Sequence, residues 1–313
     1  MEWLPPVAST FADKVDFVLI LVTVISVASC VLIAFLLIYF VIKYRRRSDN
    51  DPTPAITGDS FLETLWTVIP TILCIVIFLY GYIYYDEYTT VDKNAYEINV
   101  KAQKWMWTFN YPNGKTTLNE LYVPINKPIR LVMQSQDVLH SFFIPAFRVK
   151  QDLLGNRYTF INFTATKEGI YKIYCTEYCG AGHSDMGGKV HVLSAEKYAS
   201  WEAGSDEDVV KASADLPLDE VGKGLYQSAG CVACHSIDGS EGGVGPTWKG
   251  LFGKNREFDD GSSGTADENY LRESIEIPSA KIVKGYMPVM PAYKGVLNDS
   301  QITALIEYIK SLK

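Results

Sequence analysis

Apolar and polar residues follow different patterns in different parts of the chain. Two long apolar runs come first, and the first of them, residues 17–42, contains no charged residue. About 20 such residues cross a bilayer as a helix, so we expect membrane-spanning helices at about 17–42 and 63–86. A cleaved signal peptide is the alternative for the first run. It is disfavoured because the run is too long, and because no basic segment precedes it and no small-residue cleavage site follows.

The residues around these runs indicate their orientation. Lys43 and the arginines at 45–47 follow the first run, and basic clusters of this kind stay in the cytoplasm. Tyrosines form an aromatic belt at the far end of the second run, and acidic Asp86 follows them. Residues 1–92 therefore predict a helical hairpin with both ends outside, which places all later residues in the periplasm or outside the cell.

The segment Ser-Phe-Leu-Glu at residues 60–63 opens the second helix. It predicts a capping box in which Ser60 is the N-cap and the Glu63 side chain reaches back to the Ser60 backbone N–H. The alternative is a functional one, in which Glu63 lies at the membrane edge and feeds protons to a partner protein.

Residues 93–194 alternate apolar and polar positions over short spans, and turn sequences such as Pro-Asn-Gly at 112–114 separate these spans. Seven or eight strands at this spacing predict an antiparallel β-sandwich. The expected strands include residues 97–102, 129–133, 158–163, 170–174 and 188–193. The last two flank a loop at one end of the sandwich, a rigid place from which to present functional groups.

Residues 195–216 are rich in acidic and small residues, which predicts a linker with a short helix at about 195–203. A new helical pattern begins at Leu218 and opens a separate domain, residues 217–313. The last helix of this domain is amphipathic, and we expect Asn298 or Asp299 to cap it.

Net charge and cysteine distribution limit the classes of function that the chain can have. The formal net charge is −7, which excludes a nucleic-acid binder that depends on bulk electrostatics. Of the six cysteines, Cys30 and Cys74 lie inside the apolar runs, and the other four form two close pairs. This distribution favours two separate cofactor sites over a disulfide framework.

The first cysteine pair lies in the loop between the two late strands. Cys175, Cys179, His183 and Met186 fall within twelve residues. Soft sulfur and imidazole ligands suit copper, zinc or iron–sulfur, and a thioether favours copper because copper electron-transfer sites use Met as a weak ligand. A disulfide and a zinc loop remain alternatives on spacing alone.

The second pair forms Cys231-Val-Ala-Cys234-His235, the pattern of c-type haem attachment. The alternatives are a redox dithiol and half of a zinc site. They are disfavoured because no second cysteine pair follows and no βαβ pattern surrounds the motif. Downstream, Met287 and Met290 are the two candidates for the second axial ligand of the iron.

Several segments of the first two parts resemble the copper A domain of cytochrome c oxidase subunit II. They are residues 62–70, 104–107 and 138–141, together with the string Cys-x3-Cys-x3-His-x2-Met at 175–186. The resemblance covers roughly residues 10–195 and implies a cupredoxin-like sandwich that holds two coppers. The implied ligands are two bridging thiolates, two imidazoles and two weak ligands: Cys175 and Cys179, His140 and His183, and Met186 with the backbone carbonyl of Glu177.

The resemblance implies roles for other residues as well. The side chain of Glu177 would reach a magnesium ion at the boundary with subunit I; the alternative is a surface carboxylate. Trp105 matches the family's exposed Trp, through which electrons arrive from cytochrome c, whereas Trp107 is expected to be sandwich core. His191 matches no ligand position and is expected to be structural.

Residues 217–313 resemble small class I cytochromes c, which implies a small all-α domain. Met290 fits the family's Met-Pro-Ala-aromatic turn and would bind the haem iron opposite His235, with Met287 the less favoured choice. The carbonyl of Pro246 would accept the N–H of His235 and so orient the ring. The last helix would pack against the first near Gly224.

The whole chain resembles subunit II of a bacterial caa-type cytochrome c oxidase, a multidomain protein of hairpin, sandwich and cytochrome. The resemblance implies an electron path from an external donor, such as a cytochrome c or a quinol-oxidising complex, to haem c, copper A and haem a of subunit I. Subunit I would reduce oxygen and pump protons, subunit III is a further expected partner, and the location is the bacterial cell membrane. The alternatives are a copper A subunit of a nitric oxide reductase and a stand-alone membrane-tethered electron carrier.

Overall fold

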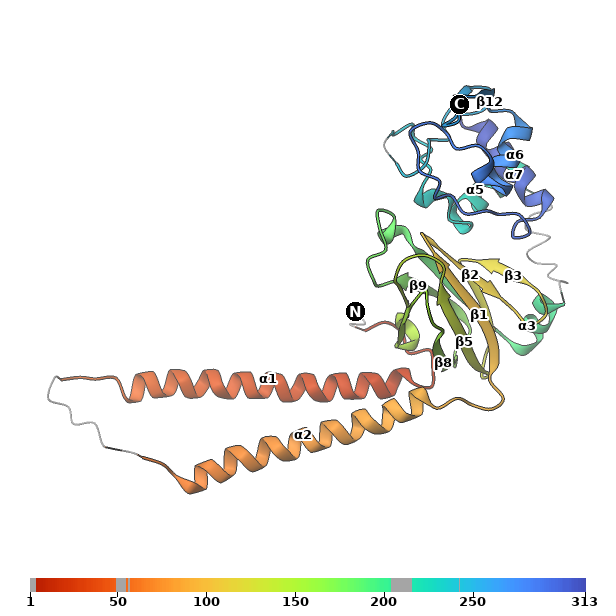
Figure 1. Cartoon of the computed structure of the whole chain (residues 1–313). Helices are drawn as coiled ribbons and strands as arrows, with labels where there is room; N and C mark the ends of the chain where they lie inside the picture. The colour runs from red at the N-terminus through yellow and green to blue at the C-terminus, as the bar shows by residue number, and fades with distance from the viewer. Residues whose placement is uncertain (1–3, 49–54, 56, 204–215, 242) are drawn as a thin grey trace. The chain divides into compact units, whose positions relative to one another are not determined.

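The computed structural model describes residues 4–48, 55, 57–203, 216–241 and 243–313. The chain divides into two compact units, Phe11–Thr90 on one side and Met1–Thr10 with Val91–Lys313 on the other. The first unit holds the two longest helices, and the second holds all of the described strands (Figure 1).

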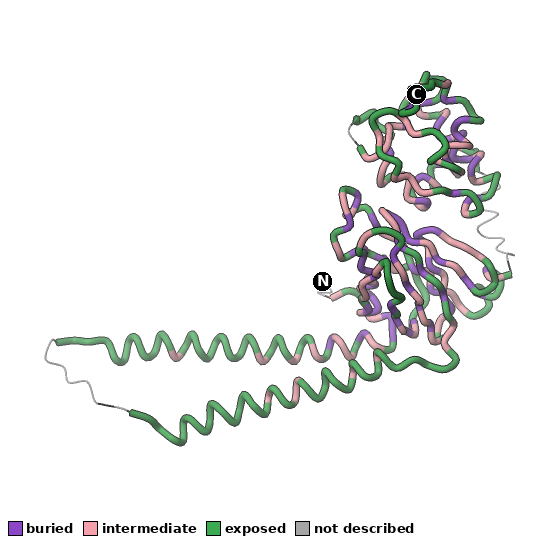
Figure 2. The backbone as a smooth tube through the Cα atoms, in the orientation of Figure 1, coloured by how far each residue is buried: buried purple, intermediate pink, exposed green. Residues whose placement is uncertain are grey.

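Two helices, α1 (Ala12–Lys43) and α2 (Ser60–Thr89), make up the first unit (Figure 1). Their apolar residues are almost all exposed, as Figure 2 shows, and both are long and apolar enough to cross a membrane. A helix that is apolar all round and not covered by protein is typical of a membrane span. The two predicted apolar helices are therefore present, and each extends a few residues beyond its predicted ends.

The N-cap of α2 differs from the prediction. Asp59, not Ser60, is the N-cap, and its carboxylate accepts the backbone N–H groups of Phe61 and Leu62 at 3.0 and 3.1 Å. Asp is as good an N-cap as Ser, and its negative charge also complements the positive end of the helix dipole. The predicted capping box at residues 60–63 is therefore wrong by one residue, which leaves the Glu63 side chain free of that role.

The sandwich consists of two five-stranded sheets, β3-β2-β1-β5-β8 and β4-β10-β9-β6-β7 (Figure 1). Alternate residues of each strand face the core between the sheets, as the burial pattern of β5 illustrates. The strands are β1 (Tyr96–Gln103), β2 (Met106–Asn110), β3 (Thr116–Leu118), β4 (Glu120–Pro124), β5 (Pro128–Ser135), β6 (His140–Ile144), β7 (Val149–Leu153), β8 (Thr159–Thr164), β9 (Gly169–Cys175) and β10 (Gly187–Leu193).

The sheets are mixed, whereas the sequence predicted an antiparallel sandwich. The pairs β1 with β5 and β4 with β10 run parallel, and the other pairs run antiparallel. Both parallel pairs join strands that are far apart in the chain. Alternation of apolar residues reveals which face of a strand is buried, but it does not reveal which strand lies beside it.

The N-terminal residues that the structure describes pack against the sandwich. The backbone N–H of Ala8 donates to Ala146 at 3.0 Å, and that of Thr10 donates to Thr164 at 3.1 Å. The hydroxyl of Ser9 donates to the carbonyl of Phe147 at 2.9 Å. These backbone groups find their hydrogen-bond partners in the sandwich, so the compact unit of the two long helices begins at Phe11.

The short helix expected at about 195–203 is present as α3 (Ala195–Glu202), with Ser194 as its N-cap. Trp201 of this helix stacks on Tyr122 of β4, with ring centroids 4.7 Å apart. The helix therefore packs on the sandwich, and the rest of the predicted linker, residues 204–215, lies outside the described residues.

The C-terminal domain is mainly helical, as expected. Its core contains Tyr226, Trp248, Leu271, Ile302 and Leu305. Asn298 caps the last helix through a capping box with Gln301 at its third position, which agrees with the prediction. The elements are α5 (Leu218–Ser228), η3 (Cys231–Ala233), β11 (Asn255–Glu257), β12 (Ser263–Thr265), α6 (Glu268–Glu276), η4 (Pro278–Ala280) and α7 (Asp299–Ser311).

The first and last helices of this domain pack together near Gly224, as expected, and their closest approach is at Gly222. A Cβ atom built on Gly222 would lie 2.7 Å from both the carbonyl carbon of Ala304 and the Cβ of Tyr308. A Cβ on Gly224 would meet nothing within 4 Å. The two glycines lie four and six residues after Leu218, the first residue of α5, and only the packing partner on α7 distinguishes them.

Gly222→Ala is therefore expected to destabilise the C-terminal domain by about 1–3 kcal/mol, the usual cost of overpacking. Gly224→Ala is the matched control, and it is expected to be neutral or to stabilise by up to about 1 kcal/mol, because Ala is the better helix former. Denaturant unfolding of the full chain measures both. Equal effects of the two substitutions would contradict this account of how α5 and α7 pack.

Candidate metal and haem sites

Two strands and one loop bring the first group of site residues to the same end of the sandwich. His140 begins β6 and Cys175 ends β9, and these strands pair antiparallel with Phe142 opposite Cys175. The loop after β9 returns to β10 and is closed by the backbone N–H of Cys175, which donates to the carbonyl of Met186 at 3.1 Å. The ligand loop is thus held by main-chain bonds at its base.

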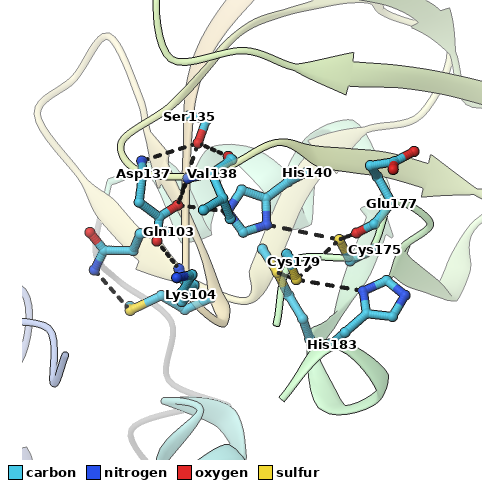
Figure 3. A network of polar contacts seen from close by, with 12 residues as sticks. Gln103, Lys104, Ser135, Asp137, Val138, His140, Cys175, Glu177, Cys179 and His183 are labelled. Atoms are coloured by element: carbon cyan, nitrogen blue, oxygen red, sulfur yellow. Dashed lines mark hydrogen bonds and ion pairs between the residues drawn. The ribbon is translucent and has the colours of Figure 1, made fainter. Parts of the chain in front are cut away.

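All of the residues that the sequence assigned to this site converge there (Figure 3). The sulfur of Cys175 lies 3.8 Å from that of Cys179, 3.9 Å from His140 Nδ1 and 3.3 Å from the carbonyl oxygen of Glu177. The sulfur of Cys179 lies 3.5 Å from His183 Nδ1 and 3.7 Å from the sulfur of Met186. Each thiol therefore has one imidazole and one weak donor beside it.

A disulfide is not formed between the two loop cysteines. Their sulfurs are 3.8 Å apart, far beyond the bond length of about 2.05 Å. Donor atoms of His140, Cys175 and Cys179 lie within 4.8 Å of one another, the geometry of a group that can hold a metal ion. The disulfide alternative is therefore wrong for this structure.

The donor set fits copper. Both imidazoles turn Nδ1 toward a sulfur, and the remaining donors are thiolate, thioether and carbonyl groups. Soft sulfur with imidazole and a weak thioether is the set that copper electron-transfer sites use. His140 and Met186 are 0% and 1% exposed, so the site is almost closed to water.

The surroundings of the two thiols shift their pKa values in opposite directions. Burial raises the pKa of Cys175, but hydrogen bonds with His140 and with the main chain of Ser141 outweigh it, and the pKa falls below the usual value. Burial and the neighbouring charge of Cys175 raise the pKa of Cys179 above the usual value. Copper binding must therefore displace at least the Cys179 proton, because the thiolate is the metal ligand.

One residue at this site was missed by the sequence analysis. The Oδ1 of Asp137 lies 2.8 Å from His140 Nε2 (Figure 3). Burial lowers the pKa of His140, but its hydrogen bonds with Cys175 and Asp137 raise it above the usual value. A metal-ligating His commonly donates its second N–H to a carboxylate. An Asp three residues before a predicted His ligand was the available signal.

Trp105, the residue through which the resemblance implied that electrons arrive, lies against the copper loop. One face of its indole packs on glycines of that loop. A Cβ on Gly182 would lie 2.6 Å from Cδ2 of Trp105, and one on Gly180 would lie 3.2 Å from Cζ2. Trp107 is fully buried, as predicted for a core residue, and its ring centroid lies 6.1 Å from that of His140.

The other predicted site residues lie outside the sulfur cluster. The carboxylate of Glu177 points away from the thiols in Figure 3. Glu63 lies in the first turn of α2 and is exposed. His191 bonds to Glu120 and stacks on Tyr122 with ring centroids 4.5 Å apart. These contacts agree with a structural role for His191.

The haem motif lies directly after α5, where the chain turns. The sulfurs of Cys231 and Cys234 are not joined in a disulfide. His235 Nδ1 lies 2.7 Å from the carbonyl oxygen of Pro246, which confirms the predicted partner and leaves Nε2 for a metal. Burial lowers the pKa of His235, so the ring is neutral and its free nitrogen can coordinate.

A mainly apolar cavity adjoins Cys234 and His235. Met287 and Met290 are both among the residues that line it. Met290 packs against the hydrophobic core, whereas Met287 is 71% exposed. Two free thiols, a neutral imidazole and an apolar cavity fit a covalently attached haem. Other lining residues are Val244, Leu271, Ile275, Ile282, Val283 and Val289.

Comparison with known proteins shows the family to which the chain belongs. Residues 3–83 match the family profile "Cytochrome C oxidase subunit II, transmembrane domain", residues 80–193 match its periplasmic domain, and residues 220–313 match "Cytochrome c". Cytochrome c oxidase subunit 2 of Alkalihalophilus pseudofirmus is 31% identical over 308 residues, which cover 95% of this chain and 86% of that protein. The same subunit of Bacillus subtilis is 28% identical over 334 residues, with 98% and 90% covered.

A solved structure with a related sequence is the periplasmic domain of subunit II of cytochrome oxidase of Bradyrhizobium japonicum. It is 32% identical, covers 38% of this chain and 99% of its own, and has a TM-score of 0.36. The family profiles together cover most of this chain, and they follow the order of its hairpin, sandwich and helical domain. The chain therefore belongs to the cytochrome c oxidase subunit II family, as a membrane-bound subunit of a haem–copper oxidase that carries its own cytochrome c domain.

Proposed function

We propose that this chain passes single electrons from an external donor to the oxygen-reducing subunit of the oxidase. The donor set at the end of the sandwich carries the proposal, because three side chains and one carbonyl converge around two thiols. When bound, the haem iron and the two coppers supply one-electron oxidation and reduction, while oxygen reduction and proton pumping belong to subunit I. The external donor would be a cytochrome c or a quinol-oxidising complex, and subunit III a further partner.

The chain's own residues would hold these groups with little freedom. Cys175 and Cys179 would hold the coppers together with His140, His183 and Met186, and a main-chain hydrogen bond between Cys175 and Met186 closes the base of the loop. A cage that is already formed reduces the rearrangement that accompanies each electron. In the cytochrome domain Pro246 orients His235, and Met290 would supply the second axial ligand.

We propose Trp105 as the residue through which electrons reach the copper loop. Its indole lies directly on Gly180 and Gly182, between the cysteines and His183 of the loop. The contact is too close for any side chain at Gly182, so the glycine permits the aromatic ring to approach the loop backbone.

Gly182→Ala is expected to slow electron transfer into the copper centre several-fold, because the tunnelling rate falls as the indole of Trp105 moves away from the copper loop. The new Cβ would collide with Trp105, whereas a Cβ on Gly187 would meet only ordinary contacts, the nearest at 3.5 Å. Gly187→Ala is therefore the matched control. Flash-induced electron transfer in the full holo-chain gives both rates, and equal rates would remove Trp105 from the route.

We also propose an orientation of the two long helices in the membrane and roles for Glu63 and Glu177. The basic residues after α1 place the loop between the helices in the cytoplasm, and the N-terminus and both soluble domains on the periplasmic or outer side. Glu63, which does not serve as a capping residue, would lie at the start of a proton path. The carboxylate of Glu177, which points away from the thiols, would reach a magnesium ion shared with subunit I.

The optical and electron paramagnetic resonance spectra of the purified holo-chain test the proposal. We expect the spectrum of a low-spin haem c together with the signal of one unpaired electron shared by two coppers. Co-purification of haem a would support the oxidase. Consumption of nitric oxide without oxygen uptake would instead favour a nitric oxide reductase, and isolation without any large partner would favour a stand-alone carrier.

A further inference from the structure

One carboxylate contacts two separate parts of the copper domain. The Oδ1 of Asp137 lies 2.8 Å from Nε2 of His140, and its Oδ2 accepts the backbone N–H of Lys104 at 2.9 Å (Figure 3). Lys104 and Trp105 form the turn between β1 and β2. We propose that Asp137 is a positioning residue that fixes the copper-binding ring of His140 and the turn of Trp105 with a single side chain. The consequence of this positioning for electron transfer rests on the proposed function.

The contact with His140 selects which nitrogen faces the metal. With Asp137 as the acceptor at Nε2, the ring proton lies on that nitrogen and the lone pair of Nδ1 faces the sulfur of Cys175 at 3.9 Å. The His140 side chain is completely buried, so water cannot replace the carboxylate as the partner of Nε2. Loss of this acceptor would free the ring to rotate or to change its tautomer.

The contact with Lys104 fixes the turn that carries Trp105. Gln103 ends β1 and pairs with Met106 at the start of β2, so the two residues between them have no ladder partner. The carboxylate of Asp137 satisfies the first backbone N–H of this turn. This hydrogen bond fixes the position of the turn relative to the copper loop, where Trp105 contacts Gly182.

Asp137 is itself held by its own loop. Its Oδ1 also accepts the backbone N–H of Val138 at 2.7 Å, and its backbone N–H donates to the hydroxyl of Ser135 at 3.2 Å. A carboxylate that is fixed in this way can accept both N–H groups at once.

Only a carboxylate can serve both partners. Each oxygen of Asp137 accepts a different N–H donor. An amide of the same size can accept only at its oxygen, because its nitrogen only donates, so it can accept from one of these two N–H donors in the observed geometry but not from both. Asp137→Asn therefore separates the two contacts without a change of volume, and Asp137→Ala removes both.

The experiment uses the full chain with two readouts. The sequence contains a single Gln-Lys step, Gln103–Lys104, so ¹³C-carbonyl Gln with ¹⁵N-Lys isolates the Lys104 amide by NMR in the metal-free chain. The second readout is copper affinity, measured by competition with a chelator. Asp152→Asn is the matched control. It also removes one charge beside the start of β6, where the Asp152 carboxylate bonds the hydroxyl of Ser141 at 2.7 Å, but it contacts neither His140 nor Lys104.

We expect Asp137→Ala to shift the Lys104 amide upfield and to lower copper affinity about 10-fold to 100-fold, whereas Asp152→Asn leaves both unchanged. Asp137→Asn is expected to change either the Lys104 amide shift or the copper affinity, but not both. If the Ala variant does not fold, the Asn variant still provides the test. A wild-type value for both readouts in Asp137→Asn would overturn the proposal, as would equal effects of Asp137→Ala and Asp152→Asn. The amide measurement needs no copper, so it remains decisive if the two-copper centre itself is not found.

Discussion

Replacing Cys175 with Ser is expected to abolish the two-copper centre. Cys175 has His140 Nδ1, the sulfur of Cys179 and the carbonyl of Glu177 around its sulfur, so no other group can take over its position as a bridge. A hydroxyl is a harder donor and a weaker acid than a thiol, and it does not replace a soft bridging thiolate for copper. We expect at most one copper per chain and no signal from an electron shared between two metals.

The membrane-helix cysteine Cys74 offers a matched control for this substitution. Cys74→Ser makes the same chemical change in a helix that holds none of the copper ligands, and it is expected to leave copper content and spectrum unchanged. Metal analysis and paramagnetic resonance of both purified variants give the result. Two coppers with a shared electron in Cys175→Ser would show that the loop cysteines are not the bridges.

Replacing Met290 with Leu is expected to remove the second axial ligand of the haem iron. Leu keeps the volume of Met but offers no sulfur, so the packing of the domain is largely retained. The iron is then five-coordinate, its spectrum changes from low spin to high spin, and its reduction potential falls because the Met ligand raises it. The reduced variant is also expected to bind carbon monoxide more readily than the parent chain.

Met287 provides the comparison that tests the assignment. Its side chain is 71% exposed, whereas Met290 packs against the core of the domain beside the cavity. Met287→Leu is therefore expected to leave the spin state and the potential unchanged. If Met287→Leu gives the high-spin spectrum and Met290→Leu does not, the two assignments must be exchanged.

The site was largely predictable from the sequence because its ligands carry a fixed chemistry at fixed spacing. The string from Cys175 to Met186 limits which metals can bind, and the pattern Cys231-x-x-Cys-His specifies the haem. Pro246 as the partner of His235 was also predicted and is confirmed. Such motifs are local, so they do not depend on knowledge of the remaining fold.

The errors and omissions concern features that only tertiary packing decides. Two glycines, Gly222 and Gly224, lie close together in α5, and only the position of Ala304 on α7 shows which of them allows close approach. The parallel pairing of β1 with β5 joins distant strands, and apolar alternation cannot reveal it. Asp59 precedes the expected N-cap by one residue, and both residue types cap helices equally well.

The packing of Trp105 and the role of Asp137 have a common origin. The ring of Trp105 lies on the copper loop because Gly180 and Gly182 leave room for it. Asp137 contacts two groups because the end of β1 and the starts of β2 and β6 lie near one another. Neither arrangement follows from the residues before the strands are placed. The sequence therefore identifies the ligands, and the structure adds the residues that hold them in place.

The most direct test of the account is the transfer of one electron within a single holo-chain. A photoreductant delivers less than one electron per chain, while the haem band and the copper band are followed separately. The account predicts that the haem is reduced first and that the electron then appears at the copper centre at a rate independent of protein concentration, since both sites lie on one chain. A haem that stays reduced while the copper stays oxidised, or a transfer rate proportional to protein concentration, would contradict it.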